Sequence, residues 1–189
     1  MLTDRCFVVL HEVRLRGLAE MHEDDEVRAL LDAGLLARAR GALRVTPTGR
    51  DAHSAWARVA PGSETERTAR RVYERFLDLN RELIRICHDW QVLPGDVPND
   101  HRDRRYDWSV IDRLRGLDDR ARPAVRRLAR AVERFERYPP RLRDAVDRVE
   151  DGDHAWLTSP RIDSYHTVWM QLHEDLLLAL GLDRASEPG

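Results

Sequence analysis

The sequence contains no lysine, and all 32 of its Lys and Arg positions are arginine. We interpret this as a compositional bias rather than as a binding signal. The basic residues are balanced by 34 acidic residues, which gives a net charge of −2. No overall positive field is therefore available to attract nucleic acid or a membrane surface, and a nucleic-acid site would need a local patch.

Cysteines and long apolar runs are also scarce. The two cysteines, Cys6 and Cys87, match no metal or redox motif, and both fall inside apolar helical patterns. Two buried thiols without a disulfide framework favour a reducing, cytoplasmic setting. The apolar run at residues 7–10 is too short for a signal peptide, and no run approaches the ~18 apolar residues that cross a bilayer. We expect a cytoplasmic protein without a membrane partner.

The first sixty residues have the pattern of a shortened winged-helix domain. Apolar spacing predicts a helix over residues 3–16 and a second helix that starts in the acidic run at 20–25 and ends at Gly34. Two short extended runs around Arg40-Gly41 predict a hairpin, the wing. Thr46 followed by Pro47 then opens a third helix.

The remaining residues, 61–189, are predicted to form an all-helical domain, so that the fold class is mainly α. Pro61-Gly62 marks the boundary, and Ser63 with Glu66 forms a capping box that starts a long helix. A loop is expected at residues 90–106 and a chain break at Pro139-Pro140. Further helices are predicted at 106–117, 121–138, 141–149 and about 160–180.

Five arginines of the first domain are candidates for DNA contacts, because they fall on the second helix, the wing and the start of the third helix. They are Arg28, Arg38, Arg40, Arg44 and Arg50. Against this interpretation, residues 1–60 hold nine arginines and nine acidic residues. The chain at 17–25 also has room for only about one turn, where DNA-binding winged helices place a further helix. A scaffold for dimerisation or docking is therefore an equal alternative.

Two polar clusters in the helical domain are candidates for a ligand pocket, since aromatic rings beside amides and carboxylates are typical of small-molecule sites. The first contains Asp89, Trp90, Asn99, Asp100, His101 and Tyr106; the second contains Tyr165, His166, Trp169 and His173. Turn formation and core packing are the alternative roles of these residues. The pocket hypothesis requires that the two clusters converge in space.

No metal site, cofactor or enzyme is predicted. His166 and His173 lie roughly 10 Å apart along a helix and cannot bind one ion. A site that combines one of them with His88, Asp89, Asp100 or His101 stays open. No nucleophile–base order, phosphate loop or paired-carboxylate motif occurs in the sequence.

Several short segments together resemble a poorly characterised bacterial family, described as MarR-like winged-helix transcriptional regulators. These segments are Asp89-Trp90-Gln91, Asn99-Asp100-His101, Tyr106-Asp107, Arg141-Leu142, Gly152-Asp153 with Trp156, and the helix stretch 163–176. The chain is also similar to a module attached to phosphoenolpyruvate-utilising, dikinase-like proteins. The resemblance implies a regulator or an accessory module and indicates no ligand or chemistry. Together with the arginines of the wing, it leads to the hypothesis of a homodimeric winged-helix regulator whose helical domain senses a small ligand or supplies the dimer interface. The alternative hypothesis is an accessory module of a phosphotransfer enzyme that does not bind DNA.

Overall fold

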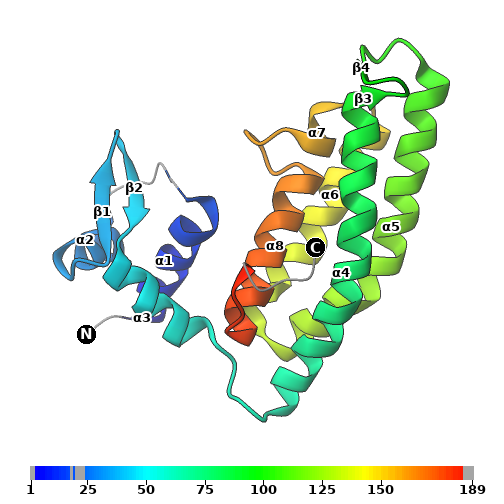
Figure 1. Cartoon of the computed structure of the whole chain (residues 1–189). Helices are drawn as coiled ribbons and strands as arrows, with labels where there is room; N and C mark the ends of the chain where they lie inside the picture. Colours follow the sequence, from blue (N-terminus) through cyan, green and yellow to red (C-terminus); the bar gives the residue numbers. More distant parts are fainter. Residues whose placement is uncertain (1–2, 18, 20–23, 185–189) are drawn as a thin grey trace. The chain divides into compact units, whose positions relative to one another are not determined.

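A computed structural model of the chain describes residues 3–17, 19 and 24–184. The protein is mainly helical and carries two small antiparallel sheets of two strands each (Figure 1). It divides into two compact units: the first joins residues 1–59 to residues 174–189, and the second comprises residues 60–173. No helix among the described residues is long and apolar enough to cross a membrane.

The first unit contains three helices and a hairpin in the predicted order. Thr3 caps the first helix by accepting a hydrogen bond from the Cys6 N–H, and Asp24 caps the second by accepting from the Val27 N–H. The second helix was predicted to start at 20–25; residues 20–23 lie outside the described part of the chain. The elements are α1 (Asp4–Arg16), α2 (Asp25–Asp32), β1 (Leu36–Ala39), β2 (Ala42–Val45) and α3 (Pro47–Ala57).

The hairpin forms because its turn residues can adopt left-handed backbone. Arg40 and Gly41 have φ angles of 52° and 81°, the conformation that a tight two-residue hairpin turn requires. Ala19 adds an isolated bridge to Leu43 of β2. Thr46 then caps α3 by accepting from the Gly49 N–H, with Pro47 in the first turn.

Buried apolar side chains of α1, α2 and the hairpin, together with Ala19 and Leu35, form the core of the first unit, and Ala52 of α3 packs against it. Gly49 is required at the contact between α3 and the hairpin region, because a Cβ there would lie 2.1 Å from the Leu35 carbonyl oxygen. The core residues are Cys6, Leu10, Val13, Ala19, Val27, Leu30, Leu35, Leu36, Leu43 and Val45.

The final helix, α8 (Tyr165–Leu180), contributes its second half to the first unit. His11 Nε2 of α1 lies 3.1 Å from Asp175 Oδ2, and the Val59 N–H donates to the Ala179 carbonyl at 2.9 Å. This division differs from the predicted domain 61–189, because Glu174, Asp175 and Ala179 bond to residues of the N-terminal segment.

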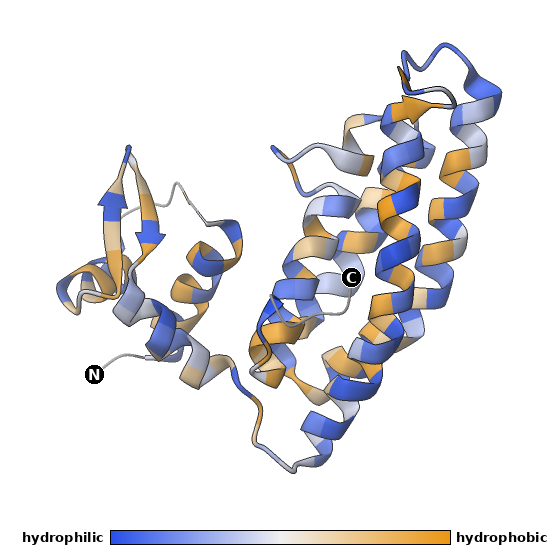
Figure 2. Cartoon of the chain, viewed as in Figure 1, coloured by the Kyte–Doolittle hydropathy of each residue, from blue (hydrophilic) through white to orange (hydrophobic). Residues whose placement is uncertain are grey.

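The second unit is built on two long helices that run side by side and are joined by a short hairpin (Figure 1). Apolar residues recur along both helices between hydrophilic ones (Figure 2), and their buried positions form the stripe that packs the bundle. The elements are α4 (Glu64–Gln91), β3 (Val92–Leu93), β4 (Val97–Pro98), α5 (Arg104–Ala131), a 3-10 helix (Glu133–Arg137), α6 (Tyr138–Glu150), α7 (Ala155–Thr158) and the first half of α8.

Two helix boundaries in this unit were predicted wrongly. The helices expected at 106–117 and 121–138 are replaced by the single helix α5, which continues to Ala131 and contains Pro123. The acidic stretch between the two predicted helices does not end α5, because Asp118 is buried, pairs with Arg122 and accepts from the Tyr165 hydroxyl. Packing at Leu117 and Ala121 holds the helix through this stretch.

The expected break at Pro139-Pro140 and loop at 90–106 were also imprecise. Both prolines lie in the first turn of α6, where the N–H that proline lacks needs no helical partner. The predicted loop contains the end of α4, the β3–β4 hairpin and the first turn of α5. The last helix begins at Tyr165 rather than near 160. Ser164 precedes its first turn, and its Oγ accepts a hydrogen bond from the Thr167 N–H.

Candidate metal centre

Two histidines and one aspartate of the second unit come together beside the β3–β4 hairpin. His101 lies in the loop before α5, Asp107 in the first turns of α5, and His154 directly before α7. Each residue offers one ligand atom, and these three atoms all lie within 4.8 Å of one another. Imidazole nitrogens and carboxylate oxygens are common ligands of transition metals, so the group is a candidate metal centre.

The loop that carries His101 is folded back onto the end of α4 by Asn99. The Asn99 N–H donates to the Gln91 carbonyl at 2.8 Å, and its side-chain Nδ2 donates to the Trp90 carbonyl at 3.0 Å. Asn99 Oδ1 in turn accepts from the His101 N–H at 3.0 Å. His101 has a φ angle of 57°, a left-handed conformation that is uncommon for non-glycine residues and is held here by these bonds.

The Asp107 carboxylate is the buried member of the group, with 3% of the residue exposed. A buried carboxylate needs partners that offset the loss of water. Asn99 Nδ2 donates to Asp107 Oδ1 at 2.9 Å, and His101 Nδ1 lies 3.2 Å from both carboxylate oxygens. The carboxylate is thereby fixed in position, and an amide that orients a ligand from behind is a usual feature of metal sites.

Aromatic contacts place the two imidazoles against Trp90. The ring centroids of His101 and His154 lie 5.0 Å apart, and those of Trp90 lie 4.5 Å from His101 and 5.1 Å from His154. Trp90 is itself buried, with 2% exposed, and supplies an apolar wall. The His101 side chain is 29% exposed, so the group faces solvent on one side.

These distances fit an ion with small side-chain adjustments. Ligands of a tetrahedral ion with bonds of about 2 Å lie about 3.4 Å from one another, close to the 3.2 Å between His101 Nδ1 and the Asp107 oxygens. Three protein ligands would leave a coordination position open toward solvent. Such a position can take water or a small anionic ligand.

The other predicted members of the first cluster lie beside this group but do not enter it. Tyr106 donates its hydroxyl to the Asp89 carbonyl at 3.0 Å, and the Asp89 carboxylate pairs with Arg113 at 2.7 Å. These three residues line a separate surface pocket of about 310 Å³. Asp100 is exposed and accepts from the Arg102 N–H, which is a local turn contact.

The second predicted cluster does not converge with the first, so the prediction of one shared pocket is wrong. The Trp169 ring stacks on Phe76 at 4.6 Å, and His173 lies 4.8 Å from the same ring. Phe76 precedes Trp90 by fourteen residues on α4, which separates them by roughly 21 Å along the helix axis. Phe76, Trp169 and His173 belong to the packed core of the bundle.

Tyr165 and His166, the remaining members of the second cluster, also lie away from the candidate metal centre. The fully buried Tyr165 hydroxyl donates to Asp118 at 3.3 Å, and burial is the main cause that raises its pKa well above the usual range. His166 is half-buried, and burial lowers its pKa. Among the described residues, neither side chain forms a hydrogen bond or ring contact with a member of the first cluster.

The candidate DNA-contacting arginines of the first unit are all exposed. Arg28 pairs with Asp25 on the same helix. Cross-strand pairing matches Arg38 with Leu43 and Arg44 with Ala37, so these two arginines extend from opposite faces of the hairpin. The five arginines therefore do not form one continuous basic face.

Comparison of the chain with protein-family models, curated proteins and solved structures gives no match.

Two members of the metal group, Asp107 and His154, were not among the predicted ligand-binding residues. His154 is 47 positions after Asp107 and has no short spacing to His101 that would indicate a ligand pair. One signal was present: Asn99, His101 and Asp107 lie within nine residues, at a helix start. The position of His154 depends on how α6 and α7 return the chain to the hairpin, which spacing does not reveal.

Proposed function

We propose that the second unit binds a divalent transition-metal ion through His101, Asp107 and His154. The observation that carries this proposal is the convergence of three ligand atoms within 4.8 Å from two segments of the chain, since His154 lies 47 positions after Asp107. A contact between neighbours in sequence would arise from local turn formation alone. His154 follows α6 in the chain, so the tertiary fold sets its position beside His101 and Asp107.

The ligand set indicates the class of ion. Two imidazoles with one carboxylate suit Zn²⁺, Fe²⁺, Co²⁺ or Ni²⁺, whereas Mg²⁺ and Ca²⁺ prefer oxygen ligands. The alternative role for these residues is a hydrogen-bonded loop anchor, in which His101 Nδ1–H donates to Asp107. That role explains the contact between His101 and Asp107, and it leaves His154 as a packing partner of Trp90 and His101.

Metal titration of the full chain tests the proposal. After removal of metal with a chelator, we expect one equivalent of Co²⁺ or Zn²⁺ to bind by calorimetry, with visible absorption from the bound Co²⁺. His154→Ala should weaken this binding at least 100-fold, because one of three protein ligands is lost. Affinity should also fall on acidification, since metal ligands must be deprotonated to bind an ion.

His88→Ala is the matched control, since His88 is an exposed histidine beside Asp89 and outside the group. Its metal affinity should equal that of the unmodified chain. Equal affinity in His154→Ala and the unmodified chain would contradict the proposal. So would a chain that binds no metal in the micromolar range.

A second candidate function, nucleic-acid binding by the first unit, is favoured by one observation. Arg40, Arg44 and Arg50 are exposed and form no ion pair with any residue in the described ranges. Many arginines of α4 and α5 instead pair with carboxylates, as Arg67, Arg70 and Arg120 do. The unpaired charges lie at the hairpin and the start of α3, where the winged-helix interpretation places phosphate contacts.

Fluorescence polarisation with a labelled 30-base-pair duplex at low salt tests this second function. Replacing Arg40, Arg44 and Arg50 together with Gln should weaken binding and flatten its salt dependence, because three phosphate contacts are lost. The control replaces Arg126, Arg127 and Arg130 of α5, which are exposed as well. Equal weakening in both variants, or no micromolar binding by the unmodified chain, would exclude nucleic-acid binding through this surface.

A further inference from the structure

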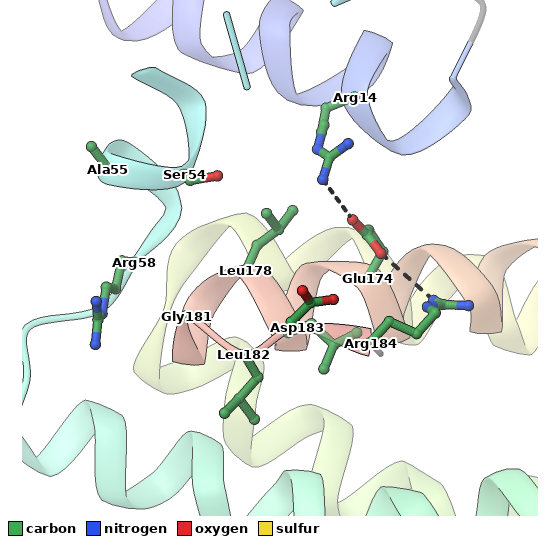
Figure 3. A pocket seen from close by; sticks show the side chains of 11 residues that line it. Arg14, Ser54, Ala55, Arg58, Glu174, Leu178, Gly181, Leu182, Asp183 and Arg184 are labelled. Atoms are coloured by element: carbon green, nitrogen blue, oxygen red, sulfur yellow. Dashed lines mark hydrogen bonds and ion pairs between the residues drawn. The ribbon is translucent and has the colours of Figure 1, made fainter. Parts of the chain in front are cut away.

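The first unit contains a pocket whose chemistry differs from that of the metal centre. It has a volume of about 640 Å³, within the size range of small-molecule sites. Its walls come from α1, the end of α3 and the last turns of α8 with the residues that follow (Figure 3). All of its lining residues belong to the first unit.

Several contacts hold these walls in place. Arg14 of α1 pairs with Glu174 of α8 at 3.1 Å, and one turn earlier His11 contacts the fully buried Asp175 at 3.1 Å. On the other side, the Val59 N–H donates to the Ala179 carbonyl. Both walls are therefore bonded to α8, and the pocket exists without a ligand to shape it.

The apolar part of the pocket lining consists mainly of three leucines. Leu177 and Leu178 are largely buried, with 2% and 8% exposed, and Leu182 is half-buried. The Gly181 N–H donates to the Leu178 carbonyl, and the Leu182 N–H donates to the Leu177 carbonyl. The polar atoms of this turn are thereby satisfied, which leaves an apolar surface for the body of a ligand.

The charges around these leucines are unevenly neutralised. Arg14 and Arg184 both contact Glu174, at 3.1 and 3.6 Å, as the dashed lines in Figure 3 show. Arg58 lies on the opposite side of the pocket and forms no ion pair within the described part of the chain. Three arginines face two carboxylates, Glu174 and Asp183, so the lining carries one excess positive charge.

The Arg58 guanidinium group lies against a glycine. Gly181 has a φ angle of 64°, and a Cβ at this position would lie 3.0 Å from the Arg58 guanidinium carbon. A side chain there would be strained by the backbone conformation, and Arg58 would have to shift by a few tenths of an ångström. Arg58 lies beside the C-terminal end of α8, where its positive charge offsets the negative end of the helix dipole. This is its alternative role.

We propose that this pocket binds a small amphipathic anion, with its apolar body on the three leucines and its carboxylate or sulfonate group at Arg58. The guanidinium group matches the planar geometry of a carboxylate and can donate two parallel hydrogen bonds to it. This binding is independent of the metal centre, since no residue is shared between the two sites.

The test uses the full chain, with chelator present, and the dye 8-anilinonaphthalene-1-sulfonate, an aromatic body with one sulfonate. We expect saturable binding at one site, with displacement by octanoate and not by the same concentration of 1-octanol. Arg58→Gln should weaken binding roughly tenfold or more, because a charge-assisted hydrogen bond is lost. Ser54→Trp should abolish binding, because Ser54 lines the pocket and is exposed, so that the new ring fills the space.

Arg5→Gln, a change to an exposed arginine of α1 in the same unit that does not line the pocket, should bind the dye as the unmodified chain does. Thermal melts of each variant exclude dye binding to unfolded protein. Unchanged affinity in either Arg58→Gln or folded Ser54→Trp overturns the proposal. An unmodified chain that shows no saturable binding overturns it equally. If Arg58→Gln alters only the melting temperature, the residue acts on the helix dipole.

Discussion

The second unit contains two clusters that combine histidine with tryptophan, and their partners differ. In the bundle interior, Trp169 Nε1 donates to Asn80 at 3.0 Å, and the ring stacks on Phe76 beside His173. At the hairpin end, Trp90 packs against His101 and His154, whose nitrogens converge on a carboxylate. The interior cluster around Trp169 is sealed from water, whereas the hairpin cluster around Trp90 is open to solvent on one side.

This difference shows that location decides the role of similar residues. At mid-helix positions, side chains are committed to a packed interface, as Trp169 is to Phe76 and Asn80. At helix ends and loops, side chains from separate segments can point at one common position. The interior cluster should therefore govern stability, and the hairpin cluster should govern metal affinity.

The largest expected effect is on the interior cluster. Trp169→Ala removes a fully buried indole and leaves the amide of Asn80 without its donor, so unfolding should become easier by about 3–5 kcal/mol. Urea denaturation measures this change. Trp108→Ala is the control, because Trp108 is 44% exposed and its loss should be nearly neutral. A loss below about 1 kcal/mol in Trp169→Ala would show that this cluster is not part of the core.

A smaller effect is expected at the hairpin cluster. Asn99→Ala removes the amide that orients Asp107, and loss of such an orienting bond typically weakens metal binding 10- to 100-fold. Co²⁺ titration measures this change. Asn80→Ala, the corresponding amide of the interior cluster, should leave Co²⁺ affinity unchanged and reduce stability instead. Similar Co²⁺ affinities in Asn99→Ala and the unmodified chain would indicate that Asn99 only holds the loop.

Much of the helical architecture could be predicted, because caps and apolar periodicity are local. Thr3, Thr46 and Ser63 all cap helices as their sequence context predicts. The errors arose where tertiary contacts outweigh local signals. Asp118 belongs to a stretch that reads as a helix break, but its buried pair with Arg122 and Tyr165 keeps α5 continuous.

The candidate metal centre was predicted only in part, for a similar reason. Trp90, Asn99 and His101 stood out as polar and aromatic residues at a predicted loop. Asp107 reads as an ordinary acidic residue of a first helical turn, and His154 reads as part of a turn after Gly152. Their role as candidate ligands depends on the tertiary fold, which brings His154 to the segment that carries His101 and Asp107. No single stretch of sequence specifies this contact.

The smallest predicted effect concerns His166, a histidine that belongs neither to the interior cluster around Trp169 nor to the hairpin cluster around Trp90. Burial lowers its pKa below the ordinary value of 6.5. In the pH range from 6.5 down to that lowered pKa, the unfolded chain binds more protons than the folded chain, so stability decreases as the pH falls. Above 6.5 the residue is neutral in both states and contributes no pH dependence. His166→Gln should therefore lessen the loss of stability on acidification and leave stability at pH 8 nearly unchanged.

Urea denaturation at pH 8 and at pH 5.5 measures this difference, with His88→Gln as the control. His88 is exposed, with 62% of its side chain accessible, so the control makes the same substitution at a histidine that faces solvent. The pH dependence of the His166 variant should differ from that of the unmodified chain and from that of the control. Identical acid sensitivity in all three would mean that His166 gains enough contact with water to titrate as it does in the unfolded chain.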